Sequence, residues 1–304
     1  MRRVLILFIS SFVFVGVSSF VNAAERLQPF VLASENNGEL AATVAEVKQK
    51  LAAAQFDVIG AYRPYKDAEV IAFTSDELKA NSLKSPRGGY AAVMRVSLTQ
   101  VDGKIQVAYT HPVYWSNAYR LSSDNENVFA KLKSTLGFIK TFGSGDKNLT
   151  AEDLREYHYT MMMEYFDDPS ELQEFASHET AVNTIEKNLK MNKGGASQVY
   201  RLALGKDSKG REMTLFGVAL GADNCSGDNY IMSRIDRSNP RHTAHLPYEM
   251  LVYGNEVEAL FARFRIAISW PHLPMMQSET GATFFSIMCA PGKIEDALEE
   301  VTEK

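Results

Sequence analysis

The sequence predicts an α+β fold of two tandem domains, each with the element order β-α-β4-α and an antiparallel sheet covered by helices on one face. A stretch typical of a long hairpin occurs twice, at residues 85–114 and 240–273, and each copy runs from a Pro-Arg dipeptide to a closing proline. The apolar residues of an expected helix also recur, at a constant offset of 138: Val44, Val47 and Leu51 match Val182, Ile185 and Leu189. A repeated element order with repeated apolar positions indicates an internal duplication.

The chain begins with the pattern of a secretory signal peptide. Arg2 and Arg3 precede an apolar run at residues 4–17, and the small residues Ala23 and Ala24 follow. This run is too short and too close to the N-terminus to favour a membrane-spanning helix. We therefore expect residues 1–23 to be a signal peptide, cleaved after Ala23 or Ala24, and the mature protein to reside in the periplasm without membrane attachment. A retained membrane anchor is the alternative.

The charge balance limits the classes of partner. The chain has 32 Lys and Arg residues against 37 Asp and Glu residues, a net charge of −5, and loss of Arg2 and Arg3 with the signal peptide would make it −7. An acidic chain without a basic run argues against binding to nucleic acid or to anionic membranes. We expect a small molecule or another protein as the partner, and the sequence identifies no cofactor.

Two cysteines occur in the chain, Cys225 and Cys289. In an oxidising compartment an even pair could form a disulfide. Position in the sequence does not show proximity, so a bridge and two free thiols both stay open.

The first domain is expected at residues 24–140, with elements predicted from apolar spacing and from turn and capping residues. In chain order they are a strand at 30–33, a helix begun by a capping box at Thr43 and Glu46, strands at 57–62 and 69–74, a hairpin from Tyr90 with its turn at Asp102-Gly103, and a helix begun by a second capping box at Ser123 and Glu126.

Residues 141–156 are rich in Gly, Asp and Thr and are expected to be a linker with a short capped helix at 150–153. The second domain, residues 157–304, then repeats the order. Its expected elements are a strand at 157–165 broken by Asp167-Asp168-Pro169, a helix from Ser177 ending at Gly194-Gly195, strands at 198–204 and 213–220, a loop at 221–230, a hairpin from Tyr248 with its turn at Gly254-Asn255, and a helix carrying Ile294, Leu298 and Val301.

The second strand of this last hairpin is predicted from strict alternation. Apolar residues at 260, 262, 264, 266 and 268 alternate with Arg263 and Arg265 on the other side. This two-residue period is typical of a strand with one buried face. It predicts a buried Ile266, whose replacement by Asp would unfold the domain, and a solvated Arg265, whose replacement by Ala would be mild.

The stretch Leu246-Pro247-Tyr248-Glu249-Met250-Leu251-Val252-Tyr253, leading into a hairpin within the order β-α-β4-α, resembles the uncharacterised family called domain of unknown function 302. Two copies would cover most of the mature chain. In the first copy Gly88-Gly89 stands where the second has Leu-Pro. The resemblance implies a fold like half of the TATA-binding protein saddle, but it implies no activity, because fold alone does not carry function.

The candidate binding residues lie just before the second hairpin. Aligned on the tyrosines, the second copy has four extra residues there, and the segment contains Arg241, His242, His245 and Glu249. We expect these residues, with His272 from beyond the hairpin, to line a ligand-contacting surface, because loops on a rigid scaffold can carry binding groups. The alternatives are a metal-dependent or other periplasmic enzyme using His242, His245 and Glu249, and a loop that only covers the sheet edge.

Other groups have weaker chemical readings. The methionines at 161–163, 275–276 and 288, with His272, could suit Cu(I), although methionine is more often core filler. Arg263 and Arg265 could clamp an anion, but a solvated sheet face is the more ordinary role. The acidic pairs Asp167-Asp168 and Asp153 with Glu156 fit loops and caps, and the chain contains no familiar nucleophile, phosphate-loop or zinc-protease motif.

Overall fold

A computed structural model describes residues 25–147, 149–158 and 165–304. The expected signal peptide, the methionines at 161–163 and most of the expected strand at 157–165 lie outside the described residues. The predicted α+β class is confirmed, since helices accompany two antiparallel sheets. Among the described residues, no helix has the length and apolar character needed to cross a membrane.

The first half, residues 25–155, contains the first sheet and its helices. Its elements are β1 (Phe30–Asn36), α1 (Leu40–Ala53), β2 (Asp57–Tyr62), β3 (Ala68–Thr74), α2 (Asp76–Ser82), the 3-10 helix η1 (Gly88–Ala91), β4 (Met94–Val101), β5 (Lys104–Thr110), α3 (Pro112–Ala118), α4 (Glu126–Leu136), β6 (Lys140–Phe142) and α5 (Ala151–Arg155).

The second half, residues 169–304, contains the second sheet. Its elements are β7 (Pro169–Glu174), α6 (His178–Lys190), η2 (Lys193–Gly195), β8 (Ala196–Lys206), β9 (Glu212–Leu220), α7 (Asp228–Ile235), η3 (Thr243–His245), β10 (Tyr248–Tyr253), β11 (Glu256–Leu260), α8 (Ala262–Ser269), η4 (Phe285–Ile287) and α9 (Ala290–Thr302).

The two sheets share one strand order. The first sheet is ordered β2-β3-β4-β5-β1-β6, and the second, read from its β8 edge, is β8-β9-β10-β11-β7. The hairpins β4–β5 and β10–β11 therefore occupy the same place in their sheets. Only the edge strand β6 lacks a counterpart among the strands that the structure describes.

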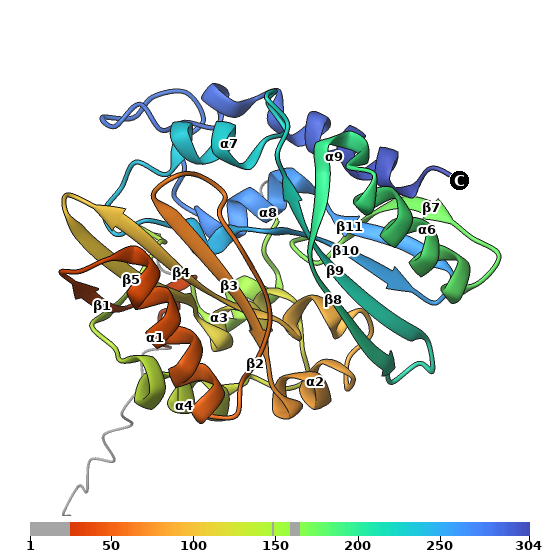
Figure 1. Cartoon of the computed structure of the whole chain (residues 1–304), viewed down its shortest axis with the longest axis horizontal. Helices are drawn as coiled ribbons and strands as arrows, with labels where there is room; N and C mark the ends of the chain where they lie inside the picture. The colour runs from red at the N-terminus through yellow and green to blue at the C-terminus, as the bar shows by residue number, and fades with distance from the viewer. Residues whose placement is uncertain (1–24, 148, 159–164) are drawn as a thin grey trace, which may run out of the picture.

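Each sheet is covered on its outer face by its own helices. Helices α1 and α4 pack together on the first sheet, and α6 and α9 pack together on the second (Figure 1). In β10, Met250 and Val252 belong to the core under α6 and α9, whereas Leu251 and Tyr253 belong to a core shared with the first half. The inner faces of both sheets are thus buried by the opposite half, and neither central hairpin has a solvated face.

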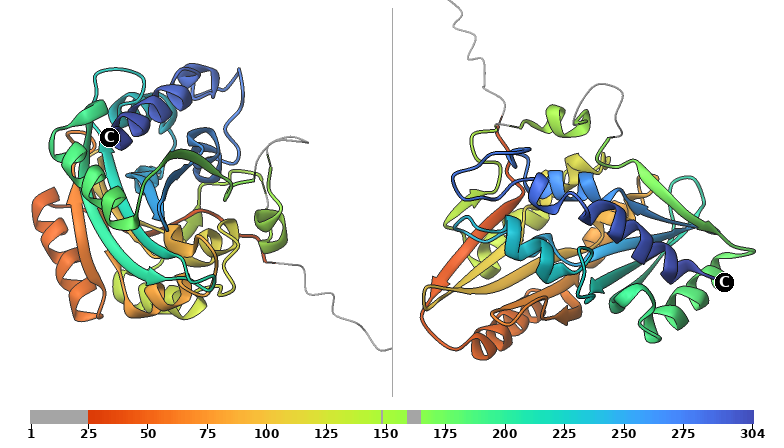
Figure 2. Two further views of the ribbon diagram at one scale, coloured as in Figure 1. Left: turned by 90° about the vertical axis from the view of Figure 1, so that its right-hand side faces the viewer. Right: turned by 90° about the horizontal axis from the view of Figure 1, so that it is seen from above.

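Contacts between the halves are reciprocal. Strands β2 and β8 lie side by side (Figure 2), so closely that a Cβ on Gly60 would meet the Val199 carbonyl oxygen at 2.3 Å. The 3-10 helix η1 packs on β9 and β10, and η3 packs on β3, β4 and β5. Both Pro-Arg dipeptides reach the opposite hairpin: Arg87 Nε donates to Glu258 Oε2 at 2.8 Å, and the Arg241 backbone N–H donates to Gln106 Oε1 at 3.1 Å.

The expected long second strand of the last hairpin is wrong. The chain leaves the sheet after Leu260 and forms α8, so Arg265 is 2% exposed and not solvated. Ile266 is fully buried, as predicted. The alternation failed because α8 is packed from several sides, and a helix buried in this way does not show the helical period.

The predicted four-residue insertion before the second hairpin is also wrong. Tyr90 lies in η1, and β4 starts only at Met94, whereas Tyr248 does start β10. Both hairpins turn on two residues, between Val101 and Lys104 and between Tyr253 and Glu256. Aligned on these turns, the segment after the Pro-Arg dipeptide is two residues shorter in the second half, not four longer.

The helix starts predicted from capping residues were correct for some helices and wrong for others. The short capped helix expected at 150–153 and the helix start at Ser177 are confirmed. Helix α1 instead begins at Leu40, so Thr43 lies inside it and its hydroxyl donates to the Glu39 carbonyl oxygen, and α4 begins at Glu126 with Asn125 in the N-cap position.

The region around the expected linker also differs from the expectation. Residues 140–142 form β6 on the edge of the first sheet, and α5 packs against α3. Pro169, expected to break a strand, is the first residue of β7, a position that proline tolerates because the ladder there needs no N–H donor. Helices α2 and α7 were not expected from the sequence.

Candidate functional site

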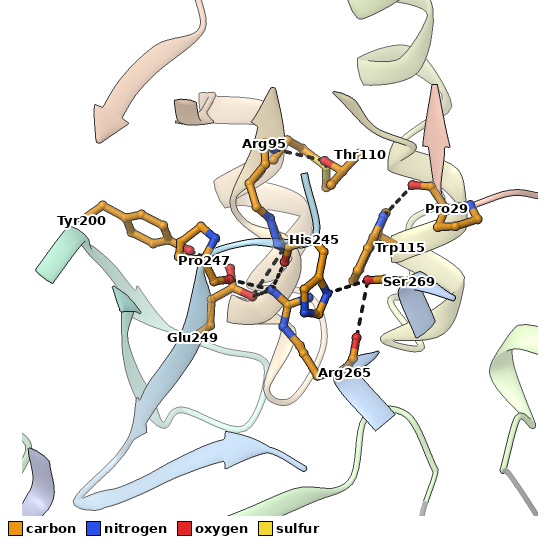
Figure 3. Close-up of polar contacts among 11 residues, drawn as sticks. Pro29, Arg95, Thr110, Trp115, Tyr200, His245, Pro247, Glu249, Arg265 and Ser269 are labelled. Atoms are coloured by element: carbon orange, nitrogen blue, oxygen red, sulfur yellow. Dashed lines mark hydrogen bonds and ion pairs between the residues drawn. The ribbon is translucent and has the colours of Figure 1, made fainter. Parts of the chain in front are cut away.

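A buried group of polar side chains lies where the two halves meet, and we call it the interface cluster (Figure 3). Its members come from β4, β8, η3, β10 and α8, and they are Arg95, Tyr200, His245, Glu249 and Arg265. Each is at most 3% exposed. Residues from both halves are needed to form it.

The Glu249 carboxylate is the centre of this cluster. Its Oε2 lies 3.4 Å from Nη2 of Arg95 and 3.4 Å from Nη2 of Arg265, and its Oε1 accepts a 2.6 Å hydrogen bond from the Tyr200 hydroxyl. Arg265 Nη2 also donates to the carbonyl oxygens of His245 and Pro247, at 2.9 and 2.8 Å. One carboxylate is thus shared by two guanidinium groups and a phenol.

Two cations against one anion leave the interface cluster positively charged. The Cζ atoms of Arg95 and Arg265 lie 5.2 and 5.5 Å from the Trp115 ring, whose π face attracts cations. Burial, followed by the nearby Glu249 carboxylate, raises the pKa of Tyr200 well above its ordinary value, so this phenol stays a donor. The cluster is closed to solvent, and its geometry ties the halves together.

His242 and His272 lie near each other, and His242 also contacts Trp270. The His242 ring stacks on Trp270 at 5.0 Å, and its centroid is 6.2 Å from that of His272. His242 Nδ1 is 3.4 Å from Asp236 Oδ1, and Asp236 also accepts, through its carbonyl, from the Arg241 guanidinium. Burial lowers the pKa of His272, with His242 as the second cause.

His245 makes a T-shaped contact with the same tryptophan. Its Nδ1 lies 2.8 Å from the Ser269 hydroxyl, and its ring is 4.9 Å from that of Trp270. Burial, and then the positive charge of Arg265, holds the pKa of His245 well below its ordinary value, so the ring is neutral.

The five candidate binding residues are therefore only partly brought together. His242 and His245 contact Trp270, His272 lies next to His242, Arg241 bonds to the Asp236 carbonyl, and Glu249 points to the two arginines. Among the residues that the structure describes, no group of three or more His, Cys, Asp or Glu side chains could hold a metal ion. His242 and His245 are 2% and 0% exposed, and their ligand-binding role stays a prediction.

Outside this group, an apolar cavity of about 210 Å³ lies against α8, and we call it the α8 cavity. Its lining is Tyr157, Arg263, Phe264, Ile266, Ala267, Trp270, Pro271, Leu273, Met275 and Phe284. Positions 263, 266, 267 and 270 follow the helical spacing of one face of α8. The rest of the lining comes from the segment after Trp270 and from Tyr157.

The packing of α3 and α8 explains why the cavity is in the second half. All seven residues of α3 are buried, and α5 packs on this helix. On α8, by contrast, Arg263 and Ala267 stay partly exposed. Sequence reasoning missed the cavity because it assigned this segment to a strand, although the apolar residues at 270, 271, 273 and 275 offered a signal.

The two cysteines are adjacent in space. Cys225 precedes α7 and Cys289 precedes α9, both thiols are free, and each is among the causes of the other's pKa shift. The methionines at 276 and 288 are exposed, at 72% and 63%.

Comparison with known proteins gives little further guidance. No family model matches the chain, and no curated protein matches it. A solved structure, that of an uncharacterised conserved protein of the domain of unknown function 302 family from Bacillus stearothermophilus, is similar at 13% identity. The match covers 35% of this chain and 93% of that one, with a TM-score of 0.31.

Proposed function

We propose that this protein binds a small apolar ligand in the α8 cavity. The observation that carries the proposal is the lining itself, in which aromatic and aliphatic side chains from α8 and residues 271–284 surround about 210 Å³ of space. Ligand sites are typically concave and mostly apolar with a few polar groups, and here Arg263 and Tyr157 supply polar atoms at the wall.

The volume restricts the size of the ligand. A buried apolar cavity of about 150 Å³ is large enough to bind benzene. The α8 cavity therefore suits a single ring or a short aliphatic chain. The predominantly apolar lining favours a ligand whose buried part carries no charge, because burying an unpaired charge is costly.

Toluene titration followed by NMR tests this proposal. The chain has two tryptophans, and Trp270 lines the cavity while Trp115 lies in the first half. We expect the indole N–H signal of Trp270 to shift saturably with toluene while that of Trp115 stays unchanged. Shifts of both signals that rise linearly without saturation would contradict the proposal.

A substitution that fills the α8 cavity provides a second test of the proposed ligand site. Ala267→Phe places a ring in the cavity and should weaken toluene binding by about tenfold or more. The matched control is Ala130→Phe, the same change at an exposed position of α4, which should leave binding unchanged. Equal toluene binding by Ala267→Phe and the wild type would exclude the cavity as the site.

We also propose that the protein is exported to the periplasm with residues 1–23 as its signal peptide. The support is the basic start, the apolar run and the small residues at Ala23 and Ala24. N-terminal sequencing of protein from the periplasmic fraction should begin at Ala24 or Glu25. Recovery of protein that still begins at Met1 would reject export by cleavage.

The two halves, we infer further, are duplicated units of the domain of unknown function 302 type. The shared strand order, the burial of Val44, Val47 and Leu51 like that of Val182, Ile185 and Leu189, and the reciprocal Pro-Arg contacts support this. In an experimental structure, β1 to β5 should superpose on β7 to β11 in order. A different place for either hairpin would reject duplication.

A further inference from the structure

The two cysteines of the chain come from segments far apart in the sequence. Cys225 lies in the loop between β9 and α7, and Cys289 lies between η4 and the first residue of α9. Helix α7 packs against η4 near the top of the molecule in Figure 1, which brings the two loops together. The Tyr230 hydroxyl of α7 lies 3.5 Å from Cys289 Sγ, and each thiol is among the causes of the other's pKa shift, so the two thiols are close neighbours.

The two thiols differ in their surroundings. The Tyr230 hydroxyl lies 3.5 Å from Cys289 Sγ, and the Arg234 guanidinium sits 3.4 Å from the Tyr230 ring. Desolvation opposes ionisation of Cys289, but hydrogen bonds from Cys225 and Tyr230 outweigh it and lower the pKa of this thiol. The hydrogen bond with Cys289, together with desolvation, raises the pKa of Cys225.

The exposure of the two side chains also favours Cys289 as the more reactive thiol. Cys289 is exposed, whereas Cys225 is partly covered. Cys289 also occupies the N-cap position of α9, where the helix dipole favours negative charge. An accessible thiol stabilised as the thiolate is the attacking group in thiol exchange, and a covered neighbour is the resolving group.

We propose that Cys225 and Cys289 form a reversible redox pair that exchanges with external disulfides, either of small thiols or of other proteins. In the first step the Cys289 thiolate attacks one sulfur of the external disulfide. The external S–S bond breaks, one thiolate leaves and takes up a proton, and a mixed disulfide forms on Cys289.

In the second step Cys225 loses its proton to solvent and attacks Cys289 Sγ. The mixed disulfide breaks, the second external thiolate leaves and is protonated, and the Cys225–Cys289 bond forms. The two protein thiols are oxidised to one disulfide, and the external disulfide is reduced to two thiols. The reverse sequence returns the pair to its thiol form.

Equilibration of the full chain in glutathione redox buffers tests the proposal. After acid quench and maleimide labelling, intact mass should show monomers with either two labelled thiols or none, and the ratio should shift reversibly with the buffer. Two labelled thiols in fully oxidised glutathione, a disulfide-linked dimer, or a bridge that reduced glutathione cannot open would each overturn it.

Single variants separate the two roles. Cys225→Ser should accumulate a glutathione mixed disulfide on Cys289, whereas Cys289→Ser should react with oxidised glutathione about tenfold more slowly. Equal rates for the two variants would contradict the assignment of Cys289 as the attacking thiol. Both side chains lie in loops, so circular dichroism of each variant should match the wild type.

Tyr230→Phe tests whether the Tyr230 hydroxyl stabilises the Cys289 thiolate. Loss of the phenol donor should slow maleimide labelling of Cys289 in the Cys225→Ser background by about threefold near neutral pH, because the thiolate is less stabilised. Tyr165→Phe, at an exposed tyrosine outside this group, is the control and should leave the rate unchanged. An unchanged rate in Tyr230→Phe would remove the hydroxyl from the proposed site.

Discussion

The hairpins β4–β5 and β10–β11 have the same register but carry different polar groups on the face that meets the other half. Counted from their turns, Ser97 corresponds to Glu249, and Gln106 corresponds to Glu258. Ser97 donates to the Ala108 carbonyl of its own hairpin, whereas Glu249 binds Arg95 of the opposite half. The backbone frame is therefore repeated in the two halves, whereas the charged groups between the halves are not.

The largest expected effect is at Glu249. Glu249→Ala would leave Arg95 and Arg265 buried without a carboxylate and should lower the free energy of unfolding by about 3–5 kcal/mol, because removing one partner of a buried ion pair leaves uncompensated charge. Ser97→Ala at the corresponding position should cost about 1 kcal/mol, the value of one ordinary hydrogen bond. Urea denaturation measures both.

Equal losses for Glu249→Ala and Ser97→Ala would mean that the charges at the interface contribute no more to stability than an ordinary hydrogen bond. Arg265→Ala should also be severe and not mild, because it removes a large buried side chain and leaves the carbonyl oxygens of His245 and Pro247 without their donor.

Helices α2 and α7 give a second contrast, because each begins with an aspartate. Asp76 is fully exposed beside Lys79, whose hydrogen bond lowers the pKa of this carboxyl. Asp228 is buried and accepts from the Tyr62 hydroxyl of the first half at 2.9 Å. Burial raises the pKa of Asp228 from 3.8 to about 7, against the opposing hydrogen bonds from Tyr62 and Leu220.

The pH dependence of stability follows from this shift. Between about pH 4 and pH 7 the folded protein keeps a proton on Asp228 that the unfolded chain releases. Stability from this group is fully present below pH 3.8 and is lost as the pH rises through about 7. The loss is on the order of 4 kcal/mol above the folded pKa.

Asp228→Asn should therefore reduce the fall of stability with rising pH. The variant should be more stable than the wild type at pH 8 and approach it at pH 4. Urea unfolding across that range measures the difference. Asp76→Asn is the control and should run parallel to the wild type. A parallel profile for Asp228→Asn as well would show that burial does not hold this proton.

The smallest effect is expected at Glu258. Burial raises the pKa of this carboxyl, although its partner Arg87 opposes the shift. Glu258→Gln would reproduce the amide that Gln106 presents in the first half. It should change the free energy of unfolding by about 1 kcal/mol or less, because the Arg87 side chain is partly exposed and such pairs contribute little. A loss of more than about 2 kcal/mol in the free energy of unfolding would show that the Arg87–Glu258 pair contributes substantially to stability.

How far the sequence predicts this fold depends on which surfaces are solvated. The spacing of Val182, Ile185 and Leu189 placed α6 correctly, because the other face of that helix meets water and keeps its polar residues. Strands β2, β3, β8 and β9 were likewise placed within one or two residues of their ends.

The same reasoning failed where the halves meet. The alternation from Leu260 to Ile268 predicted a solvated Arg265, but this side chain is buried beside Glu249, which also pairs with Arg95 of the opposite half. The buried charges of Arg95 and Glu249 compensate each other, although the two residues are 154 positions apart in the sequence. The interface cluster could not be predicted, because charge pairing across such a distance leaves no local pattern in the sequence.

The Arg95–Glu249 pair also bears on how such a molecule evolves. In a dimer of identical chains, any substitution close to the twofold axis is made twice and faces its own copy, so a new carboxylate there would meet another carboxylate. Under the duplication proposed above, joining both copies in one gene removes that constraint. Each copy could then acquire a complementary charge separately, and once acquired, the complementarity would make the halves no longer interchangeable.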